Sequence, residues 1–238
     1  MPDLLLNDED RREREGPRHG YRGRGERPGA GRYPAGLTIA ISREAGARGG
    51  TIAKRAGTKL GWQVYSQELL EYMAQEATLR QQALDQLPAG AAEWVEARLQ
   101  ARIKEQAISA NPSIVDLARM ILSLGVQGEA VLLGRGAGNI LSPRSTLHVR
   151  LVAPLEDRVA YMAQWLRLTP EEAAEQVRKR DGRRAEFLTT HFHHQPGDLY
   201  QYDMVLNTSL LGEDACADII VQAAKVKAAA LHSPPLEG

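Results

Sequence analysis

The sequence predicts an α/β domain in which helices cover a parallel β-sheet. Short runs rich in β-branched residues alternate along the chain with longer amphipathic runs, the pattern typical of strands and helices in such a sheet. The first strand leads through a glycine-rich turn directly into a helical run. The 238 residues are enough for one compact domain of about 150 to 200 residues with a sizeable core.

Five segments have the composition of strands and are bounded by turn residues. They are Leu37–Ser42, Gln63–Tyr65, Ala130–Gly134, Thr146–Val152 and Asp203–Asn207. Helical spacing of apolar residues predicts seven helices, Gly50–Leu60, Gln67–Leu79, Ala91–Ile108, Ser113–Gly125, Leu155–Leu166, Pro170–Lys179 and Glu213–Leu231. The helix at Pro170 has the best-marked start, because Thr169-Pro170-Glu171-Glu172 contains the residues of a capping box.

The two ends of the chain have the composition of unfolded segments. Residues 1–36 hold seven acidic residues and eight arginines, with little to bury after Leu6, which predicts a disordered, charged, Arg/Gly-rich tail. An RNA contact through Arg22-Gly23-Arg24-Gly25 is conceivable, but five arginines over residues 16–36 are a weak footprint and favour a solvated tail. Residues 232–238 are expected to fray.

Composition excludes several classes of protein. Thirty basic residues balance thirty acidic ones, which argues against a chain whose whole body binds nucleic acid. The single Cys216 rules out an intramolecular disulfide and fits a reducing compartment, so the cytoplasm is expected. No apolar stretch approaches the ~18 residues of a membrane span.

The glycine-rich turn is the most informative segment. It runs from Arg43 through Gly46, Arg48, Gly49 and Gly50 to Thr51. Glycines let main-chain N–H groups turn inward, and a helix start favours an anion. The Walker A pattern also requires a lysine before the Ser/Thr, and this turn has none, so a phosphate cradle and a ligand-free connection both remain open.

Two further features bear on chemistry. Arg135 follows the third predicted strand, where open α/β sheets place ligand-binding groups. Residues 178–184 gather five cations around Asp181, either a phosphate-directed cluster or a solvated helix face. The spacing of His191, His193 and His194 matches no zinc-binding pattern, so no metal site is expected there.

Three segments together resemble the cytidylate kinase-like family, relatives of the bacterial cytidylate kinases among the P-loop nucleoside monophosphate kinases. They are residues 41–70, which open with Ile41-Ser42-Arg43-Glu44; residues 131–158, around Gly134-Arg135-Gly136; and residues 168–209, around Asp181-Gly182-Arg183-Arg184. Their order and spacing agree over about residues 37–225. The resemblance implies a P-loop NTPase-type three-layer sandwich with a five-stranded parallel sheet, occupying residues 37–231. It also implies a helical nucleoside monophosphate-binding insert at about residues 80–128 and an Arg-rich lid at about residues 169–195.

The resemblance also implies site residues. The turn would bind the ATP phosphates through Arg43, Gly46, Arg48, Gly49, Gly50 and Thr51, and Mg²⁺ would arrive with ATP near Thr51. Arg135 would bind the acceptor phosphate. In the lid, the catalytic residues would be Arg180, Arg183 and Arg184, oriented by Asp181. Asn207 and Thr208 would lie beside the adenine, although an Asn-Thr pair at that point is equally a helix cap.

The implied activity is transfer of the γ-phosphoryl group of Mg-ATP to a nucleoside monophosphate, CMP or dCMP first. The expected partners are therefore small nucleotides, with no membrane involved. Because the turn lacks its lysine and no carboxylate follows Arg135, a second hypothesis stays open, a kinase-like module that binds nucleotide without efficient transfer. The predicted insert is either a cover for the acceptor or a homodimer face.

Overall fold

The structure is a computed structural model, and residues 33–231 of it are described. The chain divides into two units, Met1–Gly31 and Arg32–Gly238, and every element below belongs to the second. The predicted tail, except for its last four residues, and the predicted frayed end lie outside the described residues.

Five parallel strands form one sheet, in the order β2-β3-β1-β4-β5. This confirms the predicted fold class. The strands are β1 (Thr38–Arg43), β2 (Gln63–Tyr65), β3 (Ala130–Leu133), β4 (Thr146–Val152) and β5 (Met204–Asn207). Thr38 of the central β1 pairs with Ala130 on one side and Thr146 on the other, so the carboxyl ends of β1, β3 and β4 meet at one edge of the sheet.

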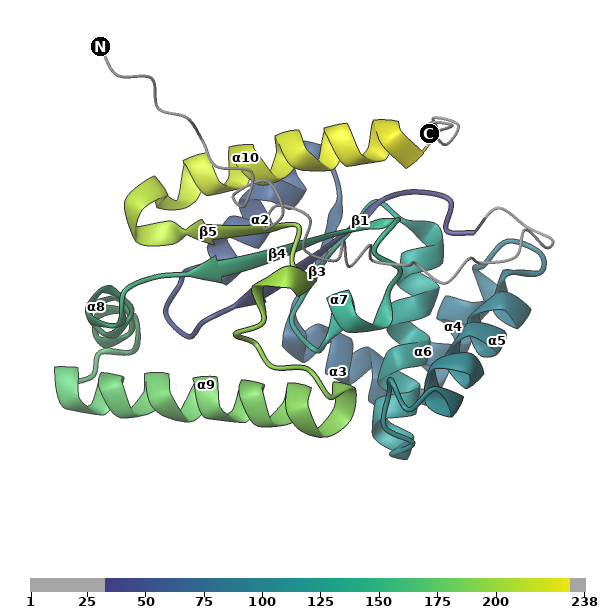
Figure 1. Ribbon diagram of the computed structural model, residues 1–238, viewed down its shortest axis with the longest axis horizontal. Helices are drawn as coiled ribbons and strands as arrows, with labels where there is room; N and C mark the ends of the chain where they lie inside the picture. Colours follow the sequence, from purple (N-terminus) through teal and green to yellow (C-terminus); the bar gives the residue numbers. More distant parts are fainter. Residues whose placement is uncertain (1–32, 232–238) are drawn as a thin grey trace, which may run out of the picture. The chain divides into compact units, whose positions relative to one another are not determined.

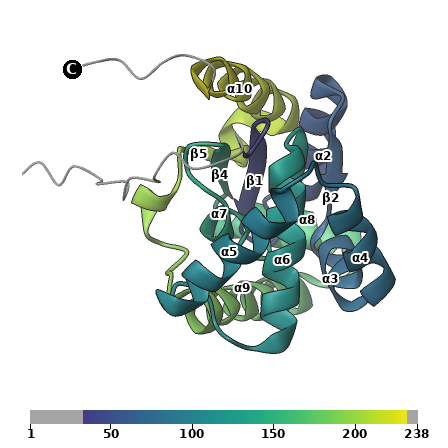
Figure 2. The same cartoon turned by 90° about the vertical axis from the view of Figure 1, so that its right-hand side faces the viewer.

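Helices cover both faces of the sheet and make three layers (Figure 1). One face packs on α2 (Gly49–Leu60) and α10 (Thr208–Leu231). The opposite face packs on α3 (Gln67–Gln75), α4 (Ala77–Asp85), α5 (Ala91–Lys104), α6 (Pro112–Gln127) and α7 (Ala137–Ile140), which Figure 2 shows gathered on one side. Side chains alternate along β1, so Ile39 and Ile41 belong to the first core and Ala40 to the second.

A helical pair lies beyond the carboxyl edge of β1. It consists of α8 (Leu155–Leu166) and α9 (Pro170–Phe192), followed by the short 3₁₀ turn η1 (Leu199–Gln201). Met162, Ala173 and Val177 are buried between the two helices together with Ala45 of the glycine-rich turn. This small core anchors the predicted lid segment to the turn.

Some predicted helix limits were wrong. The expected helix Gln67–Leu79 breaks into α3 and α4 because Glu76 is extended (ψ 110°), and Arg80 then donates to the freed carbonyls of Ala74 and Gln75. The helix at Pro170 begins with the predicted capping box but runs 23 residues to Phe192, which is buried against the core. The short α7 was not predicted.

Within residues 33–231, none of the helices combines the length and apolar character needed to cross a membrane.

Candidate functional site

The glycine-rich turn joins β1 to α2 at the carboxyl edge of the sheet. Arg48 precedes the helix in a left-handed conformation (φ 56°), and its side chain makes no capping hydrogen bond. The first N–H groups of an α-helix have no acceptor within the helix. Those of Gly49, Gly50 and Thr51 therefore point out of the start of α2, where an anion would be favoured.

Gly46 is required by packing. Its φ is +83°, and an added Cβ would lie 2.5 Å from the main-chain oxygen of Arg158 on α8. No other residue fits this combination of left-handed backbone and close approach. Gly46 thus sets how tightly the turn packs on α8, whatever the turn binds.

Asp181 fastens α9 to the glycine-rich turn. One carboxylate oxygen accepts the N–H of Ala45 at 2.7 Å, and the other accepts Nη1 of Arg158 at 2.5 Å. Arg158 also donates to the carbonyl of Ala45 at 3.2 Å. The partner predicted for Asp181, Arg184, is farther away, with Nη1 at 3.6 Å from Oδ1. Asp181 therefore binds the turn and α8 more closely than it binds a lid arginine.

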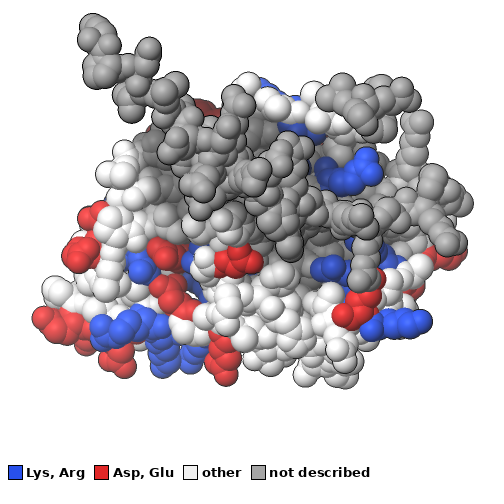
Figure 3. All heavy atoms as spheres, viewed as in Figure 1, with Lys and Arg blue, Asp and Glu red and all other residues white. Residues whose placement is uncertain are grey.

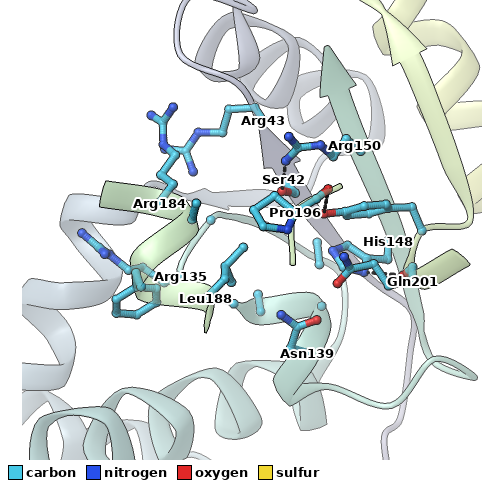
Figure 4. Close-up of a pocket in the computed structure, with 18 of the residues that line it drawn as sticks. Ser42, Arg43, Arg135, Asn139, His148, Arg150, Arg184, Leu188, Pro196 and Gln201 are labelled. Carbon is cyan, nitrogen blue, oxygen red and sulfur yellow. Dashed lines mark hydrogen bonds between the residues drawn. The ribbon is translucent and has the colours of Figure 1, made fainter. Parts of the chain in front are cut away.

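A cavity of about 190 Å³ lies between the carboxyl ends of β1, β3 and β4 and the inner face of α9. Figure 4 shows two unlike ends. Arg43, Arg135 and Arg184 lie at one end, and Asn139, His148 and Gln201 lie at the other. The first group comes from β1, the turn after β3 and α9, three parts of the chain that only the fold brings together.

The three arginines form a confined cluster of positive charge. Burial, and then repulsion from Arg184, lowers the pKa of Arg43 to about 9, against opposing attraction from Glu68. Burial is also the main cause that lowers the pKa of Arg135 and that of Arg184. Nε of Arg135 and Nη1 of Arg184 are buried without a hydrogen-bond partner among the described residues. Buried donors without acceptors, on cations that repel one another, fit an anionic ligand.

Two glycines make room for Arg43. A Cβ on Gly49 would lie 2.9 Å from Cγ of Arg43, and a Cβ on Gly134 would lie 2.1 Å from Nη1. The side chain thus runs beneath the start of α2 and ends beside the turn after β3, where Nη2 donates to Gln67 at 3.2 Å. The prediction grouped Arg43 with the ATP phosphates; its guanidinium lies with Arg135 and Arg184.

Arg135 is held in a left-handed backbone (φ 53°) between Gly134 and Gly136, which are also left-handed. Its guanidinium pairs with Glu71 of α3 and lies 4.7 Å from the ring centre of Phe187 on α9. These contacts come from the insert side and the lid side. They direct Arg135 into the cavity, as expected for a residue at the carboxyl end of a strand.

Three other predicted residues lie elsewhere. Arg48 packs over the ring of Tyr161 at 5.1 Å and approaches Glu213 at 3.9 Å, away from the cavity. Arg180 is half-buried and Arg183 is exposed, and neither lines the cavity. The exposed face of α9 carries mixed charges, visible along the lower left of Figure 3: Glu171, Glu175, Arg178, Lys179, Arg183 and Glu186.

The predicted adenine-side residues serve as caps and sheet contacts. Oδ1 of Asn207 accepts the N–H groups of Ser209 and Leu210 at 3.1 and 3.2 Å. The hydroxyl of Thr208 donates to the carbonyl of Val152 at 3.3 Å. These contacts are those of the helix-cap alternative, and a contact with adenine stays a prediction.

Sequence reasoning missed Arg150 and Arg158. Arg150 lines the cavity and donates to Ser42 at 3.0 Å, and Glu44 lies between Arg150 and Arg158, at 3.8 and 3.4 Å. One signal was present: Arg150 is a full positive charge within the mostly apolar strand β4. Its partner Ser42 on β1 is 108 residues away in the chain, so no local pattern could have named it.

The sequence profile of the cytidylate kinase-like family matches residues 38–210 of the chain. Over 102 residues the chain is 28% identical to a cytidylate kinase of Ignicoccus hospitalis, a match that covers 43% of this chain and 59% of that protein. Over 98 residues it is 33% identical to a uronate isomerase of Corynebacterium glutamicum, covering 41% and 19%. These matches thus span about three fifths and one fifth of the two relatives' lengths.

Among solved structures, an uncharacterized protein from Eubacterium ventriosum is similar with a TM-score of 0.56 and 19% identity. The match covers 79% of this chain and 98% of that one. At this identity the likeness is one of fold.

Proposed function

The chain belongs to the cytidylate kinase-like family, and on that premise we propose that it transfers the γ-phosphoryl group of Mg-ATP to the phosphate of a nucleoside monophosphate. Cytidylate is the first candidate acceptor, because one curated relative is a cytidylate kinase.

The observation that carries the proposal is the cluster of Arg43, Arg135 and Arg184. In phosphoryl transfer negative charge is spread over the equatorial oxygens of the transferring group, and catalysis consists mainly of positioning and cationic stabilisation. Three converging guanidiniums, two of them with unpaired buried donors, would supply both. Arg135 would hold the acceptor phosphate, Arg184 would reach the transferring group from α9, and Arg43 would lie between them.

The donor would be bound by the start of α2. Its open N–H groups at Gly49, Gly50 and Thr51 would donate hydrogen bonds to phosphate oxygens of ATP, and Arg43 would supply the charge that a loop lysine supplies in a Walker A motif. Among residues 33–231 no group of three or more His, Cys, Asp or Glu side chains could hold a metal ion. In the proposed reaction Mg²⁺ would arrive with ATP, carried by its phosphates near the Thr51 hydroxyl.

The test is phosphoryl transfer from Mg-ATP to CMP, dCMP, UMP, AMP and GMP, read as nucleoside diphosphate. We expect turnover of one or two acceptors, and a loss of about 10²-fold or more in the Arg135→Ala and Arg184→Ala variants. Arg144→Ala removes an exposed arginine that does not line the cavity and serves as the matched control. Turnover at the wild-type rate in both site variants would refute the assignment.

A second candidate is favoured by the absence of a loop lysine: a module that binds nucleotides without efficient transfer. It predicts that CMP or ATP raises the melting temperature while no diphosphate forms. Absence of both binding and turnover in the folded protein would contradict both candidates.

A further inference from the structure

At the end of the cavity away from Arg43, Arg135 and Arg184, three uncharged polar side chains lie near Arg150, which donates to Ser42 at 3.0 Å (Figure 4). Asn139 of α7, His148 of β4 and Gln201 of η1 face this end (Figure 4). They come from three elements and lie on the far side from Arg43 and Arg135. A ligand whose phosphate meets the arginines would direct the rest of the molecule toward these groups.

The hydrogen bonds of His148 define what its free nitrogen can do. Nδ1 lies 2.8 Å from the main-chain oxygen of Gln201. A carbonyl oxygen only accepts, so Nδ1 carries the proton. Burial lowers the pKa of His148 to about 4, which keeps the ring neutral near pH 7. Nε2 is therefore an unprotonated acceptor, and it has no hydrogen-bond partner among the described residues.

The position of the imidazole ring is fixed by close contacts. A Cβ on Gly138 would lie 2.2 to 2.4 Å from three atoms of the ring, so the ring rests directly on the main chain of α7. On another side the ring centre of Tyr202 lies 4.6 Å away. His148 is thus held rigidly, as a group that discriminates between ligands must be.

Two amides complete this end. The side-chain amide of Gln201 donates to the carbonyls of Gln195 and Asp198, at 2.7 and 3.0 Å. Its side-chain oxygen remains available as an acceptor. Asn139 is 8% exposed and lines the cavity with an amide that can donate and accept. Nε2 of His148 and the side-chain oxygen of Gln201 can only accept, so these two groups favour hydrogen-bond donors on a ligand.

We infer that this polar end is the specificity subsite for the acceptor, and that it selects a phosphate monoester whose organic part presents amino or hydroxyl donors to His148 and Asn139. The inference rests on the proposed function for the role of the ligand as acceptor. An acceptor that a bound ligand shields from water without pairing it is penalised, so a monoester lacking these donors binds more weakly although its phosphate meets the same arginines.

A second cavity is an alternative place for the organic part of the phosphate monoester. It has a volume of about 440 Å³ and lies between α3, α6 and α9, lined among others by Gln75, Ser113 and Phe187. Arg135 lies next to it, because its partner Glu71 and its ring contact Phe187 both line it. The test therefore places variants in both cavities.

The experiment measures dissociation constants by calorimetry, without ATP, for inorganic phosphate, ribose 5-phosphate, CMP and UMP. The quantity of interest is the ratio between the constant for phosphate and that for each monoester. His148→Phe keeps a ring on Gly138 but removes Nε2, and Asn139→Leu keeps the volume but removes the amide. Ser113→Ala and Gln75→Ala are the matched changes in the second cavity.

We expect the ratio for the preferred monoester to fall about 3- to 10-fold in His148→Phe and in Asn139→Leu, the value of one net hydrogen bond. Binding of phosphate itself should change less than about twofold, which also shows that each variant is folded. Ser113→Ala and Gln75→Ala should keep the wild-type ratio. Comparison of CMP, UMP and ribose 5-phosphate shows whether base or sugar supplies the donors.

The inference is overturned if His148→Phe and Asn139→Leu keep the wild-type ratio, and a fall in Ser113→Ala or Gln75→Ala would assign the organic part to the second cavity. It is also overturned if wild-type protein binds no monoester more tightly than phosphate. If a monoester binds tightly, if His148→Phe and Asn139→Leu weaken that binding, and if no phosphoryl group is transferred from ATP, the proposed function is refuted. The polar end would then still be a ligand subsite.

Discussion

At the scale of single residues, the position of Arg43 depends on two glycines that leave room for its side chain. Its guanidinium reaches the cavity because Gly49 and Gly134 have no Cβ. The two glycines are 85 residues apart in the chain, and a Cβ on either would lie within 3 Å of a different part of the same side chain. The place of the Arg43 guanidinium in the cavity is therefore determined by residues 43, 49 and 134 together.

Gly134→Ala tests this dependence. The new methyl group would collide with Nη1 of Arg43, 2.1 Å away, on a backbone with φ +84°. We expect the free energy of unfolding to fall by about 1–2 kcal/mol from the left-handed conformation, and phosphoryl transfer to fall by about 10²-fold from the displaced guanidinium. Urea denaturation and the transfer assay measure the two effects.

Gly36→Ala is the control for that change, because a Cβ there meets its neighbours at 3.7 Å or more. It should leave transfer unchanged. Equal rates in Gly134→Ala and wild type would show that Arg43 is not needed in its present place.

His148 predicts a pH dependence of stability. Its pKa is about 4 in the folded protein against an ordinary value of 6.5, so the unfolded chain binds more protons between these values. The contribution of the neutral ring is complete above pH 6.5 and is lost as the pH falls toward 4. The free energy of unfolding should drop less steeply over this range in His148→Phe than in wild type. Parallel curves would contradict the burial of a neutral imidazole.

The residue types of the site could be predicted from the sequence, but most of their contacts could not. Arg135, Asp181 and Arg184 lie in motifs that carry a family resemblance, and the structure brings all three to one cavity. Arg48 and Arg183 belong to the same motifs and lie outside it. Nothing in the linear pattern distinguishes an arginine that turns inward from one that stays on the exposed face of α9.

At the scale of elements, α9 and the glycine-rich turn are held together by shared hydrogen bonds. Asp181 accepts hydrogen bonds from the turn at Ala45 and from Arg158 of α8. The same stretch of α9 carries Arg184 into the cavity. The position of Arg184 is therefore set by a carboxylate one turn earlier in the helix.

The substitution Asp181→Asn should weaken the attachment of α9 to the glycine-rich turn. An amide can accept only one of the two hydrogen bonds and bears no charge, so we expect unfolding to become easier by about 1.5–3 kcal/mol, the range for hydrogen bonds to charged groups. The value of kcat should fall more than KM rises, because Arg184 is displaced in the transition state. Glu186→Gln, an exposed carboxylate on the same helix, is the matched control. An unchanged kcat in Asp181→Asn would show that α9 positions Arg184 without this contact.

Elements were predictable where local chemistry decides them. The capping box at Thr169 and the apolar run of β1 are sufficient to predict the start of α9 and a strand. The break between α3 and α4 depends on Arg80 covering carbonyls, and the length of α9 depends on burying Phe192 in a core formed by other helices. Such tertiary contacts produce no periodic pattern of residues in the sequence.

At the scale of the whole molecule, the site opposes folding when no anion is bound. Burial of Arg43, and then repulsion from Arg184 and Arg135, lowers the pKa of Arg43 from its ordinary value to about 9. The unfolded chain binds more protons between these values, so stability rises with pH over that range, and at pH 7 the full penalty is present. An anion that binds only the folded state removes it.

Arg43→Met should therefore raise the melting temperature of the ligand-free protein at pH 7. A gain of about 1 kcal/mol corresponds to about 2–4 °C for a domain of this size. Inorganic phosphate should raise the melting temperature of wild type and have little effect on the variant. The exposed Arg178 provides the control substitution, Arg178→Met. A lower melting temperature in Arg43→Met would mean that packing of the arginine stem outweighs the repulsion.

The left-handed run Gly134-Arg135-Gly136 has a consequence for laboratory evolution. Arg135 holds a backbone conformation (φ 53°) that suits glycine or asparagine better than arginine. A library screened for heat resistance alone should therefore accumulate glycine or asparagine at position 135, together with neutral residues at position 43. Such a population would grow more robust while its members lost the cations of the cavity, so screening for this protein must keep a phosphate ester in the selection.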